Sequence, residues 1–194
     1  QGVVVRSRAR SAGDEQALAA DRDGLYHPPL LLILEGVTDP HNLGACLRSA
    51  DAAGVDAVVV PRRHAAGLTP VACRSAAGAA EALAYFEVGN LARVLEMLKD
   101  RRIQVAGTAL NERSQSLFDF QPDAALAVVM GAEGEGLRRL TLERGDELIA
   151  IPMAGDVQSL DVSVATGVVL SHVRRHGDIK ALHITGHGDG DQIV

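Results

Sequence analysis

Short apolar runs alternate along this chain with stretches in which apolar residues recur every three or four positions. Residues 30–34 form a continuous apolar run, which is typical of a strand buried on both faces of a sheet. Leu43, Cys46 and Leu47 then recur at helical spacing, and Gly54 supplies a stop. We expect strands at 30–34, 57–60, 83–88, 103–107, 125–130 and 147–151, with helices near 43–53, 91–98, 136–143 and 160–175. This order predicts an α/β fold with a mostly parallel sheet, which binds ligands at the carboxyl ends of its strands.

The composition is that of one ordinary globular domain, because 47% of the 194 residues are hydrophobic and 23% are charged. We expect the domain to span 30–177. Residues 1–29 show little periodicity and are interpreted as an interdomain linker, and residues 178–194, rich in glycine and aspartate, as a flexible tail. No apolar stretch reaches the ~18 residues that a membrane span requires, and the N-terminus has no signal-peptide hydrophobic region.

The charge and the cysteines limit the possible partners. A formal net charge of −6 is not typical of a nucleic-acid-binding protein, so any RNA site must be a local arginine patch. Two cysteines, Cys46 and Cys73, are too few for a disulfide framework, which favours a reducing, cytoplasmic setting. His172 and His176 lie four residues apart on an expected helix, but no third ligand is evident, and we expect no metal.

Three segments that follow expected strands carry residues able to do chemistry. The loop 131–136, Gly-Ala-Glu-Gly-Glu-Gly, lets backbone amides approach a ligand, although a plain strand-to-helix turn could use some of its glycines. It matches neither the dinucleotide fingerprint nor the P-loop. In the segment 39–50, Asn42 is either functional or a helix cap, and Arg48 is either functional or a solvated or ion-paired arginine. In the segment 151–167, Ser159 and Asp161 have the same alternative as caps of an apolar helix.

Together the three segments resemble the three motifs of the SpoU family of RNA 2′-O-ribose methyltransferases, in the SPOUT superfamily. Motif one is Asn-x-Gly-Ala-x-x-Arg, present here as Asn42, Gly44, Ala45 and Arg48. Motif two is the apolar strand followed by Gly131, Glu133, Gly134 and Gly136. Motif three is Ile151-Pro152-Met153, followed by Ser159-Leu160-x-Val162-Ser163. The order and spacing of the motifs match over residues 30–175. The residues within the motifs are most similar to those of the members that act on a guanosine of bacterial 23S rRNA.

The resemblance implies a six-stranded, mostly parallel sheet with helices on both faces and a C-terminal segment threaded through a deep trefoil knot. It implies S-adenosylmethionine bound in that knot, RNA as substrate (23S rRNA, with tRNA as the alternative), and a homodimer whose site is shared across the interface. The positions that match cofactor-binding loops are Thr108, Ala109, Met130, Gly131, Gly134, Ile151, Met153, Ser159 and Leu160. The positions that match catalytic residues are Asn42, Arg48, Glu133, Ser159 and Asp161. In full-length relatives an RNA-binding domain precedes a linker, which residues 1–29 resemble.

One position departs from the family pattern, which usually has asparagine where this chain has Asp161. An ionised aspartate only accepts hydrogen bonds, whereas asparagine also donates. Asp161 therefore either leaves an acceptor unpaired, as in a noncatalytic RNA- or cofactor-binding relative, or pairs with an arginine and keeps the site intact. A Rossmann-type nucleotide-binding domain is disfavoured, because residues 36–40 carry no glycine fingerprint after the first strand.

Overall fold

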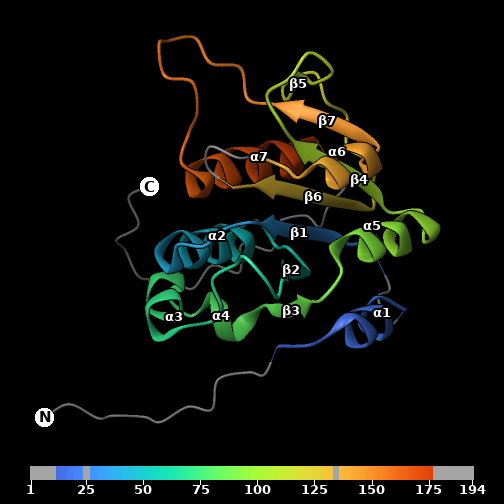
Figure 1. The fold of residues 1–194 in the computed structure, drawn as a ribbon, viewed down its shortest axis with the longest axis vertical. Coiled ribbons are helices and arrows are strands. Elements are labelled where there is room, and N and C mark those ends of the chain that lie inside the picture. Colours follow the sequence, from blue (N-terminus) through green and yellow to red (C-terminus); the bar gives the residue numbers. More distant parts are fainter. Residues whose placement is uncertain (1–11, 24–26, 133–135, 177–194) are drawn as a thin grey trace, which may run out of the picture.

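A computed structural model describes residues 12–23, 27–132 and 136–176, and it contains one parallel sheet in the order β3-β2-β1-β6-β4-β7-β5 (Figure 1). The strands are β1 Leu30–Glu35, β2 Ala57–Pro61, β3 Ala84–Val88, β4 Gln104–Thr108, β5 Gln115–Ser116, β6 Leu126–Gly131 and β7 Glu147–Ala150. The helices are α1 Glu15–Asp23, α2 Pro40–Ala52, α3 Pro70–Ala76, α4 Ala79–Ala82, α5 Leu91–Asp100, α6 Arg139–Arg144 and α7 Val162–His176. Every ladder between named strands is parallel, which confirms the predicted α/β class.

Within the described residues the sheet has seven strands rather than the expected six. The additional strand, β5, contains only Gln115 and Ser116 and pairs with β7 at one edge of the sheet. Two polar residues give no apolar run, so the pattern that predicts the other six strands does not detect β5. The short helices α3 and α4 were likewise not expected.

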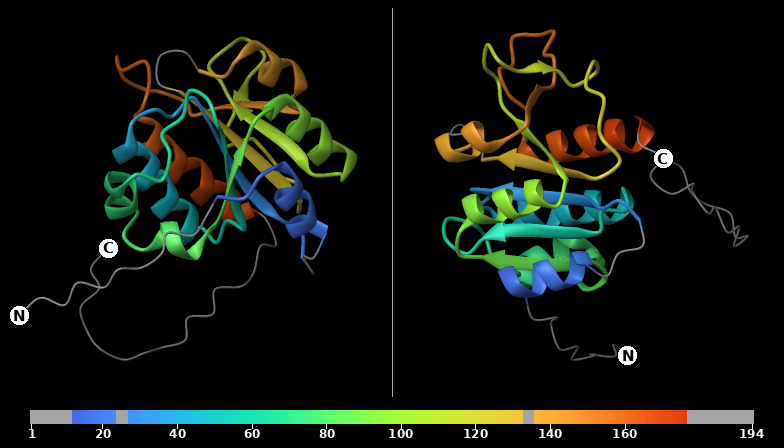
Figure 2. Two further views of the ribbon diagram at one scale, coloured as in Figure 1. Left: turned by 60° about the horizontal axis from the view of Figure 1, so that its bottom comes forward. Right: turned by 90° about the vertical axis from the view of Figure 1, so that its right-hand side faces the viewer.

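β1 lies between β2 and β6, and its side chains alternate between two hydrophobic layers. Leu30, Leu32 and Leu34 join the layer formed with α2, α3, α4 and α7, whereas Leu31 and Ile33 join the layer formed with α1 and α5. The left view of Figure 2 shows α2, α3 and α7 on one side of the sheet and α1 and α5 on the other. Helices therefore cover both faces, as a continuous apolar strand requires.

The connection from β4 to β6 packs against the last helix. β4 lies between β6 and β7 in the sheet, so this connection runs out to β5 at the edge and back. On its return, Leu117 and Phe120 are buried in the same layer as α7, and the carbonyl oxygen of Phe120 lies 3.3 Å from Nε2 of His172. α7 also contacts α2, so residues 117–120 and α2 both pack against it.

Within the described ranges, no helix is long and apolar enough to cross a lipid bilayer.

The segment expected to be a linker includes a helix that is docked on the sheet. Gly13 exchanges two backbone hydrogen bonds with the edge strand β3, of 2.9 Å to Tyr85 and 2.8 Å from Glu87. Leu18 on α1 is fully buried, and the carboxylate of Glu15 accepts hydrogen bonds from the backbone amides of Gly89 and Asn90 at the start of α5. These contacts are long-range, which explains why the local sequence pattern does not predict them. Residues 1–11 and 24–26 of the expected linker, residue 177 at the end of the expected domain and the expected tail 178–194 lie outside the described residues.

The Glu15 carboxylate makes the docking of α1 sensitive to pH. Its own backbone amide, and those of Gly89 and Asn90, lower the pKa of Glu15 against the opposing effect of partial burial. The stabilisation is therefore complete above the pKa of the unfolded chain and is lost as the pH falls through the lowered folded value. We expect Glu15→Gln to reduce the free energy of unfolding by about 0.5 kcal/mol at pH 7, and the difference to disappear near pH 3.

Denaturant unfolding of both proteins at the two pH values measures this difference. The matched control is Glu81→Gln, which changes an exposed glutamate on α4 and is expected to have little effect at either pH. If Glu15→Gln lowers the free energy of unfolding as much at pH 3 as at pH 7, the assigned role of the carboxylate is wrong.

Candidate active site

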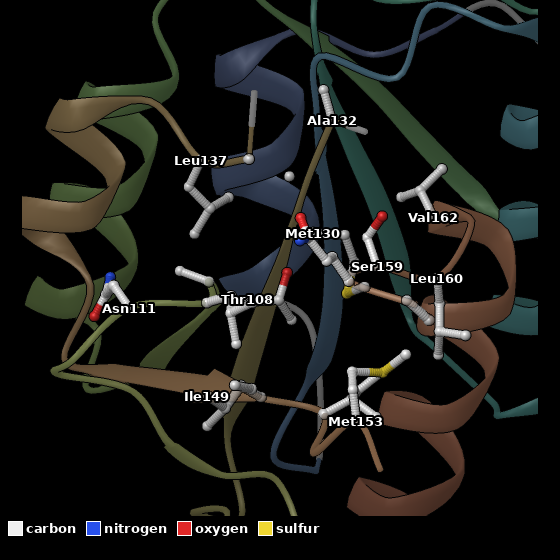
Figure 3. Close-up of a pocket in the computed structure, with 18 of the residues that line it drawn as sticks. Thr108, Asn111, Met130, Ala132, Leu137, Ile149, Met153, Ser159, Leu160 and Val162 are labelled. Atoms are coloured by element: carbon white, nitrogen blue, oxygen red, sulfur yellow. The ribbon is translucent and has the colours of Figure 1, made fainter. Parts of the chain in front are cut away.

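A cavity of about 540 Å³ opens at the carboxyl ends of β4, β6 and β7 (Figure 3). Every expected cofactor residue that the structure describes lines this first cavity: Thr108, Ala109, Met130, Gly131, Ile151, Met153, Ser159 and Leu160. In Figure 3 the side chains of Thr108, Met130 and Ser159 lie together in the middle of the view. The ninth expected residue, Gly134, lies outside the described residues. The structure thus brings together positions that are up to 52 residues apart in the chain, from Thr108 to Leu160.

Hydrogen bonds between neighbouring strand ends hold the wall of the first cavity. Thr108 Oγ1 donates to the carbonyl oxygen of Val129 at 3.1 Å, which joins β4 to β6. The amide of Ala109 donates to the carbonyl oxygen of Ile149 at 3.0 Å, which joins β4 to β7. Apolar side chains such as Met130 and Ile149 lie between these polar links. An apolar cavity with a few placed hydroxyl groups is typical of a small-molecule site.

The glycine-rich loop closes on itself at its two ends. A Cβ added to Gly131 would lie 2.5 Å from the carbonyl carbon of Gly136 and 2.7 Å from the amide nitrogen of Leu137, so no larger residue fits without a backbone shift. The amide of Gly136 donates to the carbonyl oxygen of Ala132 at 2.9 Å, and Gly136 has a φ of +64°. Gly131 and Gly136 therefore serve the turn itself. Glu133, an expected catalytic residue, lies outside the described residues.

A second cavity of about 390 Å³ adjoins the first, and Ala132, Gly136 and Val162 line both. Glu35, the last residue of β1, lines this cavity. The sequence analysis did not identify it as a site residue. Glu35 is only 4% exposed, and its carboxylate accepts hydrogen bonds from the amide of Arg138 at 3.1 Å and from Thr141 Oγ1 at 3.0 Å. The signal was present as an acidic residue that ends an apolar strand. Its function is to hold the start of α6 against the end of β1.

Asn42 lines the second cavity, whereas Arg48 lines neither cavity. Both residues are on α2, whose N-cap is Asp39: its carboxylate accepts a hydrogen bond of 3.0 Å from the amide of His41. Asn42 is therefore not the cap that the sequence allowed as an alternative. Arg48 is exposed, and among the described residues it does not join Asn42 at the second cavity or Ser159 at the first.

Asp161 caps α7, and Ser159 does not. Asp161 Oδ1 accepts a hydrogen bond of 2.8 Å from the amide of Ser163 and a second one from the hydroxyl group of Ser163. In this position the side chain acts as an acceptor, and a carboxylate beside a helix N-terminus is also favoured electrostatically. Ser159 is exposed and lines the first cavity.

Among residues 12–23, 27–132 and 136–176, no group of three or more histidine, cysteine, aspartate or glutamate side chains is placed to hold a metal ion.

Because Asp161 acts as an acceptor at a helix start, asparagine should replace it with little loss. We expect Asp161→Ala to reduce the free energy of unfolding by about 1 kcal/mol, and Asp161→Asn by at most about 0.3 kcal/mol. Denaturant unfolding measures both differences, and Asp156→Ala, which removes an exposed carboxylate from the preceding loop, serves as the control. An asparagine variant as unstable as the alanine variant would show that α7 requires the negative charge.

Comparison with known proteins points to one family. The sequence profile of the SpoU rRNA Methylase family matches residues 29–171. A Burkholderia sp. protein named 23S rRNA (guanosine-2′-O-)-methyltransferase RlmB is 58% identical over 170 residues, which cover 88% of this chain and 68% of that protein. The SpoU methyltransferase AviRb from Streptomyces viridochromogenes, solved in complex with the cofactor AdoMet, is similar with a TM-score of 0.71 and 30% identity over 80% of this chain and 63% of that chain. This chain thus spans less than two thirds of AviRb. A TrmH/SpoU tRNA modifying enzyme from A. aeolicus is similar with a TM-score of 0.68 and 28% identity over 84% of this chain and 83% of that chain.

Proposed function

The chain belongs to the SpoU rRNA methylase family, and we propose that it transfers a methyl group from S-adenosylmethionine to the ribose 2′-hydroxyl of a guanosine in 23S rRNA. One observation carries the proposal: the first cavity gathers every described residue that the family motifs assign to the cofactor. The 58% identity to a relative named for 23S rRNA favours that substrate over tRNA, on which the A. aeolicus neighbour is named to act. We place the reaction in the cytoplasm, where bacterial rRNA is modified.

The residues of the first cavity fit S-adenosylmethionine. The volume of this cavity, about 540 Å³, lies within the ~300–1,000 Å³ of typical ligand pockets. Met130, Met153 and Leu160 offer apolar contact, and Gly131 lets the loop backbone of Gly136 and Leu137 pack closely beside the cavity. Thr108 and Ser159 supply hydroxyl groups at the same cavity. When bound, the cofactor supplies an electrophilic methyl group on its sulfonium.

The chain's own task is to hold the ribose hydroxyl and ease the loss of its proton. Asn42 lines the second cavity and would orient the ribose there. An arginine keeps its proton because its pKa lies above ~12, so Arg48 would clamp an RNA phosphate through two hydrogen bonds and stabilise the developing oxyanion. Glu133 would orient Arg48 or Asn42. Ser159 and Asp161 are the remaining two positions that match catalytic residues of the family.

We propose a homodimer, because Arg48 is exposed on α2 and lines neither cavity of its own chain. A second subunit, or the RNA itself, must bring Arg48 to a reacting ribose. α7 provides apolar surface for such an interface, since Val164 is 52% exposed.

We also propose that the C-terminal segment is threaded as a trefoil knot. Two observations support this. The chain passes from β7, which lies on the far side of β4 from β6, to α7, and α7 then packs against both residues 117–120 and α2. In the proposed organisation residues 30–177 form the methyltransferase domain, 1–29 precede it as a connecting segment whose part 12–23 is docked, and 178–194 form a tail.

Titration of S-adenosylmethionine into the purified chain tests the cofactor assignment. Calorimetry should show micromolar binding with about one site per subunit, and Gly131→Ala should weaken it at least about tenfold, since the added Cβ displaces the loop backbone. Gly67→Ala is the matched control, because a Cβ there meets only a carboxylate oxygen of Glu87 at 3.8 Å. No binding to the folded wild-type chain would overturn the proposed cofactor.

Arg48→Lys tests the clamp. Lysine keeps the charge but lacks the planar fork, so methyl transfer to 23S rRNA should fall at least about tenfold while the affinity for S-adenosylmethionine stays unchanged. Arg93→Lys, at an exposed position on α5, is the control. Near-full activity of Arg48→Lys would exclude the bidentate role.

A further inference from the structure

We propose that the second cavity holds the nucleoside to be methylated, with its base stacked on His64 and hydrogen-bonded by Arg138. The inference rests on the proposed function and names the substrate contacts of the same site. The second cavity shares Ala132, Gly136 and Val162 with the first, so a ligand in one lies beside a ligand in the other. Its volume of about 390 Å³ is large enough for one nucleoside and smaller than the neighbouring cavity.

His64 is the one ring among the described residues that line the second cavity. RNA-binding sites hold unstacked bases on aromatic rings, histidine rings or arginine planes. This chain has no tryptophan, three phenylalanines and two tyrosines, so few other side chains could provide a platform. The His64 side chain is exposed at the cavity and is therefore free to take a base on its face.

The backbone on both sides of His64 is fixed. The amide of Arg62 donates to the carbonyl oxygen of Val88 at 2.8 Å, and the amide of Ala66 donates to the carbonyl oxygen of Val37 at 2.7 Å. His64 itself has a φ of +59°, a left-handed conformation that histidine adopts more readily than most residues. The loop after β2 is thereby tied to the loop after β1, and the ring is held at the cavity rather than left on a free loop.

Arg138 supplies a positive charge at the same cavity. Its amide is bound by the buried Glu35 at 3.1 Å, and its exposed side chain has no ion pair with any described residue. The next two arginines differ, since Arg139 pairs with Glu143 at 3.2 Å and Arg144 with Glu96 at 3.0 Å. Two arginine donors match O6 and N7 of guanine, which adenine cannot match because it carries an amino group at position 6. The Arg138 guanidinium thus selects guanosine over adenosine.

The stacking contact is tested on the whole chain with a short single-stranded RNA that carries 2-aminopurine, whose fluorescence falls on stacking. The wild-type chain should quench the probe, and His64→Asn should weaken its binding about 5- to 150-fold, the range measured when a stacking side chain is removed. Asparagine retains the left-handed backbone preference and removes the ring. The neighbouring Arg63→Ala is the control, because Arg63 is exposed and lines neither cavity.

Methyl transfer to 23S rRNA with guanosine or adenosine at the target position tests Arg138. Arg138→Ala should raise KM for the guanosine substrate and reduce the preference over adenosine at least about tenfold, with an unchanged salt dependence of binding. Arg139→Ala should retain the preference. If Arg138→Ala instead reduces the slope of log binding constant against log salt concentration by about one and keeps the preference for guanosine, Arg138 contacts a phosphate, and base recognition is overturned.

Calorimetry with S-adenosylmethionine separates this inference from the function on which it rests. Normal cofactor affinity in all four variants, with the losses confined to His64→Asn and Arg138→Ala, supports the nucleoside site. Two results would overturn it while cofactor affinity stays normal: the wild-type chain does not quench the probe, or His64→Asn binds the probe as well as the wild type does. Either result leaves the methyltransferase assignment in place.

Discussion

The burial of β1 on both faces governs the arrangement of the rest of the molecule. Its leucines alternate between the layer of α2 and α7 and the layer of α1 and α5, so neither layer can form without it. β1 also pairs with β6 in register over its whole length, from Leu30↔Leu126 to Glu35↔Gly131. That register places Glu35 beside the glycine loop, where its carboxylate holds Arg138 and Thr141 at the start of α6. The end of β1 thereby lines the second cavity, and its neighbour β6 ends at both cavities through Met130, Gly131 and the following Ala132.

The residues that line both cavities are Ala132, Gly136 and Val162, all of them small or β-branched. Ala132 and Gly136 pair with each other, and Val162 begins α7. For the proposed reaction this shared border matters, because methyl transfer depends on how the donor in one cavity and the acceptor in the other are positioned. The cap formed by Asp161 belongs to the same arrangement, since it fixes where α7 starts and hence where Val162 lies.

The sequence predicts six strands because each is an apolar run bounded by breaks, and it predicts most of the first cavity because the motif resemblance extends over residues 30–175. It fails where tertiary contacts act alone. β5 has no apolar residue, and Gly13 is held by the edge of β3 rather than by its own neighbours. At the site, the sequence allowed Asp161 as a helix cap and left its effect on the site open, and only the structure shows that its carboxylate accepts from Ser163. Glu35 and His64 gave too weak a signal, since an acid after a strand and a histidine in a loop are common.

The docking of residues 12–23 also bears on how this protein behaves at high concentration. An exposed edge strand offers unpaired amides and carbonyls to other chains, and it is a frequent start of aggregation. Here Gly13 occupies backbone groups along β3, and the opposite edge of the described sheet is a strand of two residues. Part of one edge is occupied, and the other is only two residues long. The segment that precedes the sheet thus takes up two of the backbone groups of β3 through which another strand could pair.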